Sequence, residues 1–261
     1  MLLSEPPPSQ GDLRFSVFGF PVRVHPMFWV VAVILGLDRK NGTPPAELLL
    51  AVAVILISIV VHELGHAFAQ RHFGGRPRIT LYGLGGLASC NDCDRSPRSQ
   101  ILISLAGPAA GFAAALLLLL LIKISGRSAY FLLPGQKFAP SGDPRNLIEL
   151  SFLGLSVIWE EFASPYVNFV LGKAFWINIG WGLINLLPIY PLDGGQVSRE
   201  LFTLQQPRRG IVMSLQLSMV AAGAMALIGV MLWQSLFTAL MFGYLAYSNY
   251  QTLQAYRSNR W

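Results

Sequence analysis

Two long stretches of this sequence carry no charged side chain, and they limit the possible folds. Residues 99–122 contain no Asp, Glu, Lys or Arg over 24 positions, and residues 210–256 contain none over 47 positions. One helix of 47 residues would be about 70 Å long, more than twice the roughly 30 Å of a bilayer core, so the second stretch predicts two membrane spans. Only 12% of all residues are charged, against about 25% in soluble domains. We therefore expect an α-helical integral membrane protein, which excludes a soluble enzyme, a disordered chain and a secreted disulfide scaffold.

The apolar runs predict about six transmembrane helices in a single domain over residues 12–250. A flexible tail is expected at 1–11 and a short tail at 251–261. The spans are predicted at about 24–38, 46–72, 99–123, 166–188, 210–232 and 235–253. The first apolar run is the shortest, and it can cross the bilayer only together with flanking residues.

Short strands are expected near the cytoplasmic side. Residues 13–24 alternate roughly and turn at Gly19, which predicts a β-hairpin at the membrane surface. Residues 74–92 are glycine-rich with strand-like pieces. The mixed segment 123–165 is interpreted as a luminal loop with an amphipathic or re-entrant piece near 147–159.

The distribution of basic residues sets the expected orientation. With six spans both termini lie on one side, which then carries twelve Lys and Arg residues against six on the other. This bias favours cytoplasmic termini and suits a bacterial inner membrane. The net charge of +6 comes without a dense basic run interleaved with aromatics, so we expect the lipid bilayer as a partner and no nucleic acid.

The strongest local motif is H-E-x-x-H inside the second predicted span. His62 and His66 are four residues apart, so on a helix both side chains lie on one face and can reach one metal ion. Glu63 lies beside them and can accept a proton from an attacking water. Ionisable side chains inside a transmembrane helix are costly and mark a functional site.

A catalytic zinc site uses three protein ligands, so a third is expected elsewhere. Pro188 and Pro191 break the end of the fourth span. Asp193 follows in this irregular stretch, and Gly194 and Gly195 allow close approach of the backbone. In the six-span topology both motifs lie at a similar depth, near the cytoplasmic side.

With these motifs, the sequence resembles the site-2 protease family of intramembrane zinc metalloproteases. The resemblance covers about residues 12–200 and rests on His62-Glu63-Leu64-Gly65-His66-Ala67, on Asn185-Leu186-Leu187-Pro188 with Asp193-Gly194-Gly195, on Gly83-Leu84-Gly85-Gly86 and on Ser104-Leu105-Ala106-Gly107-Pro108. The chain looks like a compact form, with no room for a PDZ domain or regulatory nucleotide-binding domains between its spans.

The resemblance implies a zinc endopeptidase that cleaves a single-pass transmembrane protein near the cytoplasmic side. His62, His66 and Asp193 would bind Zn²⁺, and Glu63 would be the general base. Asn185 would polarise the scissile carbonyl or hold its oxyanion.

The glycine-rich segment supplies an expected substrate site. A protease must hold an unwound transmembrane segment extended, and an edge strand can pair with its backbone. Glycines keep such an edge clear of side chains. We therefore expect Gly83, Leu84, Gly85 and Gly86 to contact the substrate.

Three alternatives remain open. A metal-ion transporter could use the same His/His/Asp site, although residues 210–256 offer no ionisable side chain apart from tyrosines to continue a path. A non-proteolytic relative that only binds membrane partners would not need Glu63. A lipid hydrolase could share the zinc site, but it would not need the edge strand. Cys90 and Cys93 are interpreted as two incidental thiols, kept reduced in a cytoplasmic loop.

Overall fold

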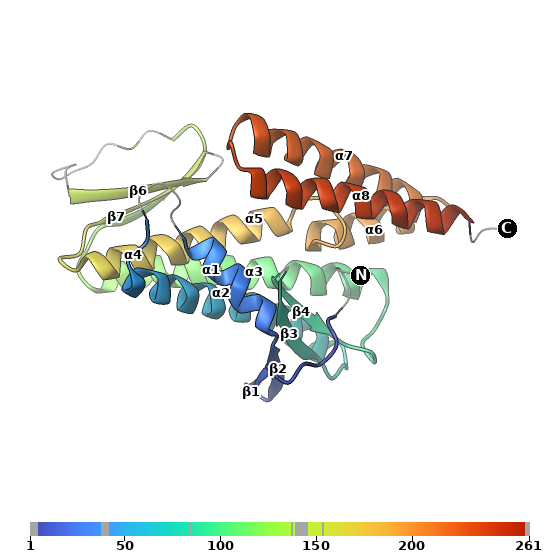
Figure 1. The fold of residues 1–261 in the computed structure, drawn as a ribbon, viewed down its shortest axis with the longest axis horizontal. Helices are drawn as coiled ribbons and strands as arrows, with labels where there is room; N and C mark the ends of the chain where they lie inside the picture. Colours follow the sequence, from blue (N-terminus) through green and yellow to red (C-terminus); the bar gives the residue numbers. More distant parts are fainter. Residues whose placement is uncertain are drawn as a thin grey trace. The chain divides into compact units, whose positions relative to one another are not determined.

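The computed structural model describes residues 5–37, 42–83, 85–136, 138, 146–152 and 154–258, and the chain forms two compact units (Figure 1). The first unit contains Met1–Phe68, Arg76–Asn91 and Gly107–Gly182. The second unit contains Ala69–Gly75, Asp92–Ala106 and Leu183–Trp261. The strands are β1 Leu13–Val17, β2 Phe20–Val24, β3 Arg78–Tyr82, β4 Gly85–Ser89, β5 Ala129–Leu132, β6 Leu147–Phe152 and β7 Leu155–Glu160. The helices are α1 Pro26–Gly36, α2 Pro45–His72, α3 Pro97–Ile124, α4 Pro165–Phe175, a π-helical segment Trp176–Trp181, α5 Gly182–Asn185, α6 Asp193–Gln205, α7 Gly210–Met231 and α8 Leu236–Ser258.

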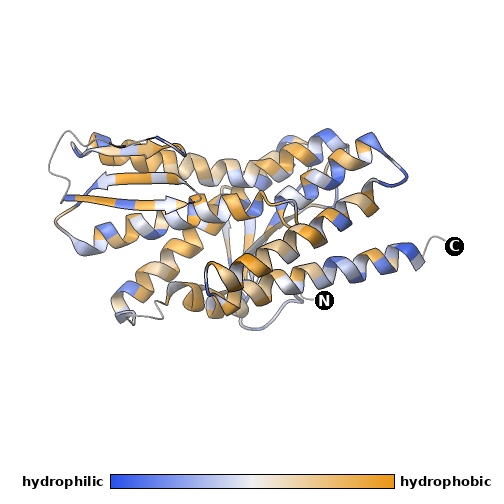
Figure 2. Ribbon diagram, turned by 90° about the horizontal axis from the view of Figure 1, so that it is seen from above, coloured by the Kyte–Doolittle hydropathy of each residue, from blue (hydrophilic) through white to orange (hydrophobic). Residues whose placement is uncertain are grey.

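Within the described residues, four helical stretches are long and apolar enough to cross a membrane. They are α2, α3, the stretch Pro165–Asn185 and α7, and hydrophobic residues cover much of their length in Figure 2. Helix α1 is apolar but has only 11 residues, about 16 Å of helix against about 30 Å of hydrocarbon. Helix α8 has 23 residues, and polar residues are interspersed along its C-terminal half. The described residues are thus mostly helical with four candidate membrane spans, while the count of six spans stays a prediction.

The first unit contains a four-stranded sheet in the order β1-β2-β3-β4. The expected hairpin is confirmed: β1 and β2 pair antiparallel, and Gly19 at the turn has a φ of +81°. Strands β2 and β3 pair parallel, and β3 and β4 antiparallel. Parallel neighbours need a long crossover, which here contains α1 and α2. Among the strands of the described residues, β4 pairs only with β3 and is therefore an edge of the sheet.

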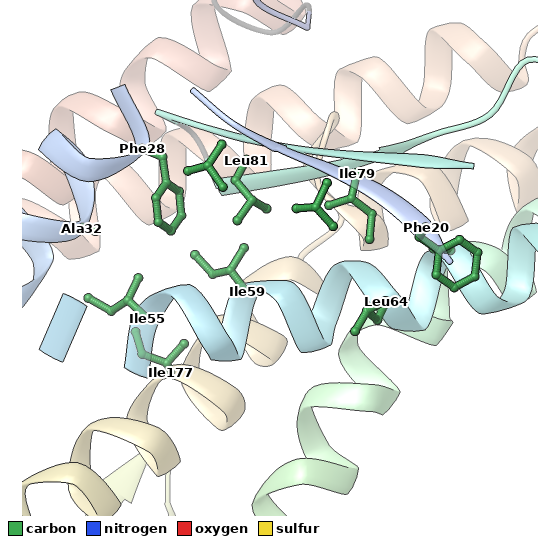
Figure 3. Close-up of a cluster of buried hydrophobic side chains, with 12 residues drawn as sticks. Phe20, Phe28, Ala32, Ile55, Ile59, Leu64, Ile79, Leu81 and Ile177 are labelled. Carbon is green, nitrogen blue, oxygen red and sulfur yellow. The ribbon is translucent and has the colours of Figure 1, made fainter. Parts of the chain in front are cut away.

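A buried apolar cluster joins this sheet to the helices of the first unit (Figure 3). Alternate residues of the strands point to one face, among them Ile79 and Leu81, which are at most 1% exposed. They pack over Ile55 and Ile59 of α2 and beside Phe28 of α1. This packing fixes β3 and β4 against the stretch of α2 that carries the histidine motif.

The segment near 147–159, expected as an amphipathic or re-entrant piece, forms two paired strands. Strands β6 and β7 pair antiparallel, and β5 pairs with the other side of β7. Gly154 at the turn has a φ of +87°, a conformation that favours glycine. Val157, Ile158 and Trp159 of β7 are buried, so β-branched and aromatic residues fill a central strand.

Contacts from Arg23 on β2 hold the segment before β1. The Arg23 guanidinium lies 3.0 Å from the Glu5 carboxylate and 3.2 Å from that of Asp12. Thr80 of β3 also donates a hydrogen bond to Glu5 at 2.7 Å. Burial raises the pKa of Asp12, but hydrogen bonds from Ser9 and Arg23 outweigh it and lower this pKa to about 2.

The second unit contains α6 and the antiparallel helices α7 and α8, which are joined by residues 232–235. This turn confirms the division of the 47-residue uncharged stretch into two helices. Gln234 in the turn has a φ of +48°, a left-handed conformation that reverses the chain direction.

The cysteine pair differs from the expectation. Neither Cys90 nor Cys93 is free, since the two are disulfide-bonded. The interpretation as reduced thiols is therefore wrong for this structure. Only two residues separate the cysteines in the loop after β4, so the two sulfur atoms can meet.

Candidate active site

Helix α2 places the three motif residues together, as the helical spacing predicts. His62, Glu63 and His66 are buried, with exposed fractions of 4%, 4% and 7%. The Nε2 atoms of His62 and His66 lie 3.1 Å apart. Glu47 lies in the first turn of α2 and Arg71 in its last, which suits the helix dipole at both ends. His62, Glu63 and His66 thus form a buried polar turn inside an otherwise apolar helix.

The geometry of this group fits a metal ion. Ligand atoms of His62, Glu63 and His66 all lie within 4.8 Å of one another. Two nitrogen ligands of one tetrahedral zinc ion, each about 2.05 Å from it, lie about 3.3 Å apart, close to the observed 3.1 Å. The pair of imidazoles is therefore arranged to share one ion.

Gly107 on α3 keeps the space beside the imidazoles clear. A Cβ atom at position 107 would lie 2.7 Å from His62 Nε2 and 2.5 Å from His66 Cε1, and nearer still to His66 Nε2. Any side chain at this position would therefore overlap the tips of both rings. This glycine belongs to the Ser104–Pro108 motif, but its role depends on a contact between two helices.

Strand β4 lies directly against Glu63. A Cβ atom at Gly86 would lie 2.5 Å from both Cδ and Oε1 of the Glu63 carboxylate. Gly85 has a φ of +117°, and its Cβ position lies 2.7 Å from the Trp181 ring. Gly83 contacts α1 near Met27, and Leu84 lies outside the described residues. The predicted edge strand thus passes the predicted base.

Tyr82, at the end of β3, interacts electrostatically with the Glu63 carboxylate. Burial raises the pKa of the Tyr82 hydroxyl, and the negative charges of Glu63 and Glu5 raise it further. Tyr82 therefore stays protonated at neutral pH and presents a neutral polar group beside the site.

A buried polar pair lies one helical turn before the histidines, and the sequence interpretation missed it. Asn178, in the π-helical segment, donates a hydrogen bond to Ser58 Oγ at 2.9 Å and another to the Ala174 carbonyl at 2.9 Å. Ser58 precedes His62 by four residues, so it lies on the same face of α2. Two features of the sequence could have indicated this pair. Asn178 lies in an apolar span, and Ser58 lies four residues before His62, as His62 lies four residues before His66.

Asn185 and Asp193 belong to the second unit. Helix α5 ends at Asn185, and both side chains are buried, at 7% exposure. Asp193 was expected in an irregular stretch, but it is the first residue of α6. An acidic residue favours the first turn of a helix because it interacts with the positive end of the helix dipole, which explains the difference.

The two glycines after Asp193 allow the expected close backbone approach. A Cβ atom at Gly194 would overlap the Leu186 carbonyl oxygen and lie 2.6 Å from that of Leu187. One at Gly195 would lie 2.5 Å from the Ile189 carbonyl oxygen. The start of α6 therefore packs directly on the broken end of the preceding span.

Comparisons with known proteins agree with this geometry. Residues 50–232, more than half of the chain, match peptidase family M50. The chain belongs to that family. A zinc metalloprotease of Methanocaldococcus jannaschii is 26% identical over 72% of this chain and 44% of its own length. Stage IV sporulation protein FB of Bacillus subtilis is 25% identical over 71% of this chain and 49% of its own length.

The M50 chain also shares its fold with a solved structure. A site-2 protease from Methanocaldococcus jannaschii superimposes with a TM-score of 0.57 at 21% identity, covering 93% of this chain and 95% of that one. The chain spans less than half the length of the curated relatives it matches. None of these proteins supports the metal-transporter alternative.

Proposed function

We propose that this M50 chain is an intramembrane zinc endopeptidase that cleaves membrane-spanning proteins near the cytoplasmic side. One observation carries the proposal: two imidazole nitrogens lie 3.1 Å apart beside a buried glutamate, inside a helix apolar enough to span a membrane. Nothing in the packing of such a helix requires three buried ionisable residues, so they have a chemical role.

His62, His66 and Asp193 form the proposed ligand set. Two imidazoles and a carboxylate match the three-ligand sites of catalytic zinc. When bound, zinc polarises the scissile carbonyl and makes water a better nucleophile at neutral pH. The family of the chain and the names of its relatives support this choice of metal.

Glu63 is the proposed general base. Glu63 follows His62 directly in the sequence. Its carboxylate contacts the backbone of Gly86. It removes a proton from the attacking water and transfers it to the leaving amine. Asn185 orients the scissile carbonyl or donates a hydrogen bond to its oxyanion.

The outer edge of β4, on the side away from β3, is the proposed substrate site. An extended peptide can add to this edge through backbone hydrogen bonds. Because Gly86 lies against Glu63, a peptide paired beside Gly85 and Gly86 would run past the base. The contacts of Gly83 and Leu84 with the substrate belong to the same proposal.

The proposed membrane arrangement has six spans, with both termini in the cytoplasm of a bacterial cell and the protein in its inner membrane. The excess of basic residues on the side of the termini supports this orientation. The substrate is a single-pass transmembrane protein, whose single helix can unwind and extend along β4.

The test compares two glutamates of α2 by the same substitution. Purified full-length wild type, Glu63→Gln and Glu47→Gln are assayed for bound zinc and for cleavage of a model transmembrane peptide. We expect about one zinc per chain in all three. Glu63→Gln should lower kcat by at least about 100-fold, and Glu47→Gln, at the other end of the helix, should cleave like wild type.

Two results would contradict the proposal. One is a Glu63→Gln protein that still cleaves at the wild-type rate. The other is a wild-type protein that binds zinc and cleaves no transmembrane peptide.

A further inference from the structure

Helices α7 and α8 contain two deeply buried polar residues that the proposed chemistry does not use. Ser218 is 0% exposed and Asn249 is 1% exposed. Ser218 lies eight residues after the start of α7, and Asn249 nine residues before the end of α8. At 1.5 Å per residue both are about 12–14 Å from the same end of the helix pair. Polar groups buried this completely need protein partners for their hydrogen bonds.

Both side chains bind the backbone of one residue, Tyr190. The Tyr190 N–H donates a hydrogen bond to Ser218 Oγ at 3.0 Å. Asn249 Nδ2 donates to the Tyr190 carbonyl at 2.6 Å, and also to the Leu245 carbonyl of its own helix. The two backbone polar groups of Tyr190 are therefore held from two different helices.

The short path from Tyr190 to Asp193 has little freedom. The N–H of Leu192 donates to the Ile189 carbonyl at 2.8 Å. The side-chain amide of Gln196 donates to the Pro191 carbonyl at 3.3 Å. Because Gly195 packs on the Ile189–Tyr190 backbone, the first turn of α6 follows any movement of Tyr190.

We infer that Ser218 and Asn249 are positioning residues for Asp193: by clamping the Tyr190 backbone they set the orientation in which this carboxylate meets the metal. The inference rests on the proposed function, in which Asp193 is a zinc ligand. Groups that orient a metal ligand typically change metal affinity about 10- to 100-fold when they are removed.

Helix α7 also supplies a matched control. Ser214 lies one turn before Ser218 and is 2% exposed, but its hydroxyl donates only to the Ile211 carbonyl of the same helix. Ser214→Ala and Ser218→Ala therefore remove the same group from equally buried positions of one helix, and only the second frees the Tyr190 amide.

The experiment measures Zn²⁺ affinity of the purified full chain by competition with a chromophoric chelator. The proteins are wild type, Ser218→Ala, Asn249→Leu, Ser214→Ala and Asp193→Ala. We expect an affinity loss of about tenfold or more for Ser218→Ala and for Asn249→Leu, and less than about twofold for Ser214→Ala. Asp193→Ala, which removes a ligand, should lose more than either.

Hydrogen exchange of the zinc-free proteins gives a readout that does not depend on the metal. The amide of Tyr190 should be protected in wild type and in Ser214→Ala, and should exchange faster in Ser218→Ala. The wild-type measurement tests the clamp even if Ser218→Ala does not fold, since an unprotected Tyr190 amide in wild type would overturn the inference.

The possible failures can be told apart. If Asp193→Ala loses zinc while Ser218→Ala and Asn249→Leu bind it like wild type, the clamp is refuted and the proposed function stands. Equal losses in Ser214→Ala and Ser218→Ala also refute the clamp, because the effect is then one of general helix packing. If Asp193→Ala binds zinc like wild type, the proposed ligand set itself fails.

Discussion

Replacing Gly107 by alanine tests whether the two imidazoles bind one metal ion. The added methyl group would lie 2.7 Å from His62 Nε2 and 2.5 Å from His66 Cε1. Side-chain Cβ atoms essentially never approach other heavy atoms within 3.0 Å, so the His66 ring must withdraw by at least 0.5 Å. Both rings lie on a helix whose backbone is fixed by the apolar cluster, so the imidazoles move and the helix stays.

This displacement is large for a metal site, where ligand distances hold to about 0.2 Å. We expect Gly107→Ala to lose at least about 100-fold in zinc affinity, which corresponds to about 2.7 kcal/mol. Peptide cleavage should fall in parallel, because the loss is in metal binding. The fold should persist, since alanine is a better helix former than glycine.

The assay is zinc titration and peptide cleavage on wild type, Gly107→Ala and Gly223→Ala. Gly223 lies in α7, and among the described residues no heavy atom outside its chain neighbours and the adjacent helix backbone lies within 4 Å of its Cβ position. This control therefore adds the same methyl group without a steric conflict. Wild-type zinc affinity and cleavage in Gly107→Ala would refute the assignment of the two imidazoles to one ion.

Three further predictions address neighbouring features. In Gly86→Ala the added Cβ would lie 2.5 Å from the Glu63 carboxylate. This variant should retain zinc but cleave at least tenfold more slowly, which corresponds to about 1.4 kcal/mol. A cleavage rate equal to that of wild type would contradict the contact between Gly86 and Glu63. Gly195→Ala should lower the melting temperature, measured by thermal unfolding in detergent, because its Cβ would lie 2.5 Å from a backbone carbonyl oxygen; an unchanged temperature would mean that α6 can shift freely. The Asp12 pKa of about 2 lies below the unfolded value of about 3.9, so its stabilisation is present above pH 4 and disappears as the pH falls through about 2. The melting temperatures of wild type and Asp12→Asn should therefore differ at pH 5 and converge towards pH 2.

The proximity of His62 and His66 could be predicted from the sequence because it depends on local geometry. In a helix, residues four apart share a face whatever surrounds them, so His62 and His66 needed only a helical α2. The hairpin was predictable for the same reason, since Gly19 and the alternating residues around it specify a turn between neighbouring strands.

Contacts between distant segments could not be predicted in this way. The Ser104–Pro108 motif contributed to the family resemblance, but the position of Gly107 beside the imidazoles depends on how closely α3 approaches α2. Similarly, Gly86 meets Glu63 only because the buried cluster fixes β3 and β4 on α2. The start of α6 at Asp193 was missed because two nearby prolines and two glycines suggested an irregular chain, whereas backbone packing by Gly194 and Gly195 permits a helix there.

The strand order β1-β2-β3-β4 has a consequence for peptide capture. Among the described strands, the sheet ends at β4 on one side and at β1 on the other, and backbone pairing alone does not distinguish these two edges. A peptide added beside β1 would lie four strand spacings from β4, about 19 Å, and so beyond reach of Glu63. If β4 is the substrate site and Glu63 the base, capture at β1 would therefore hold a peptide without cutting it.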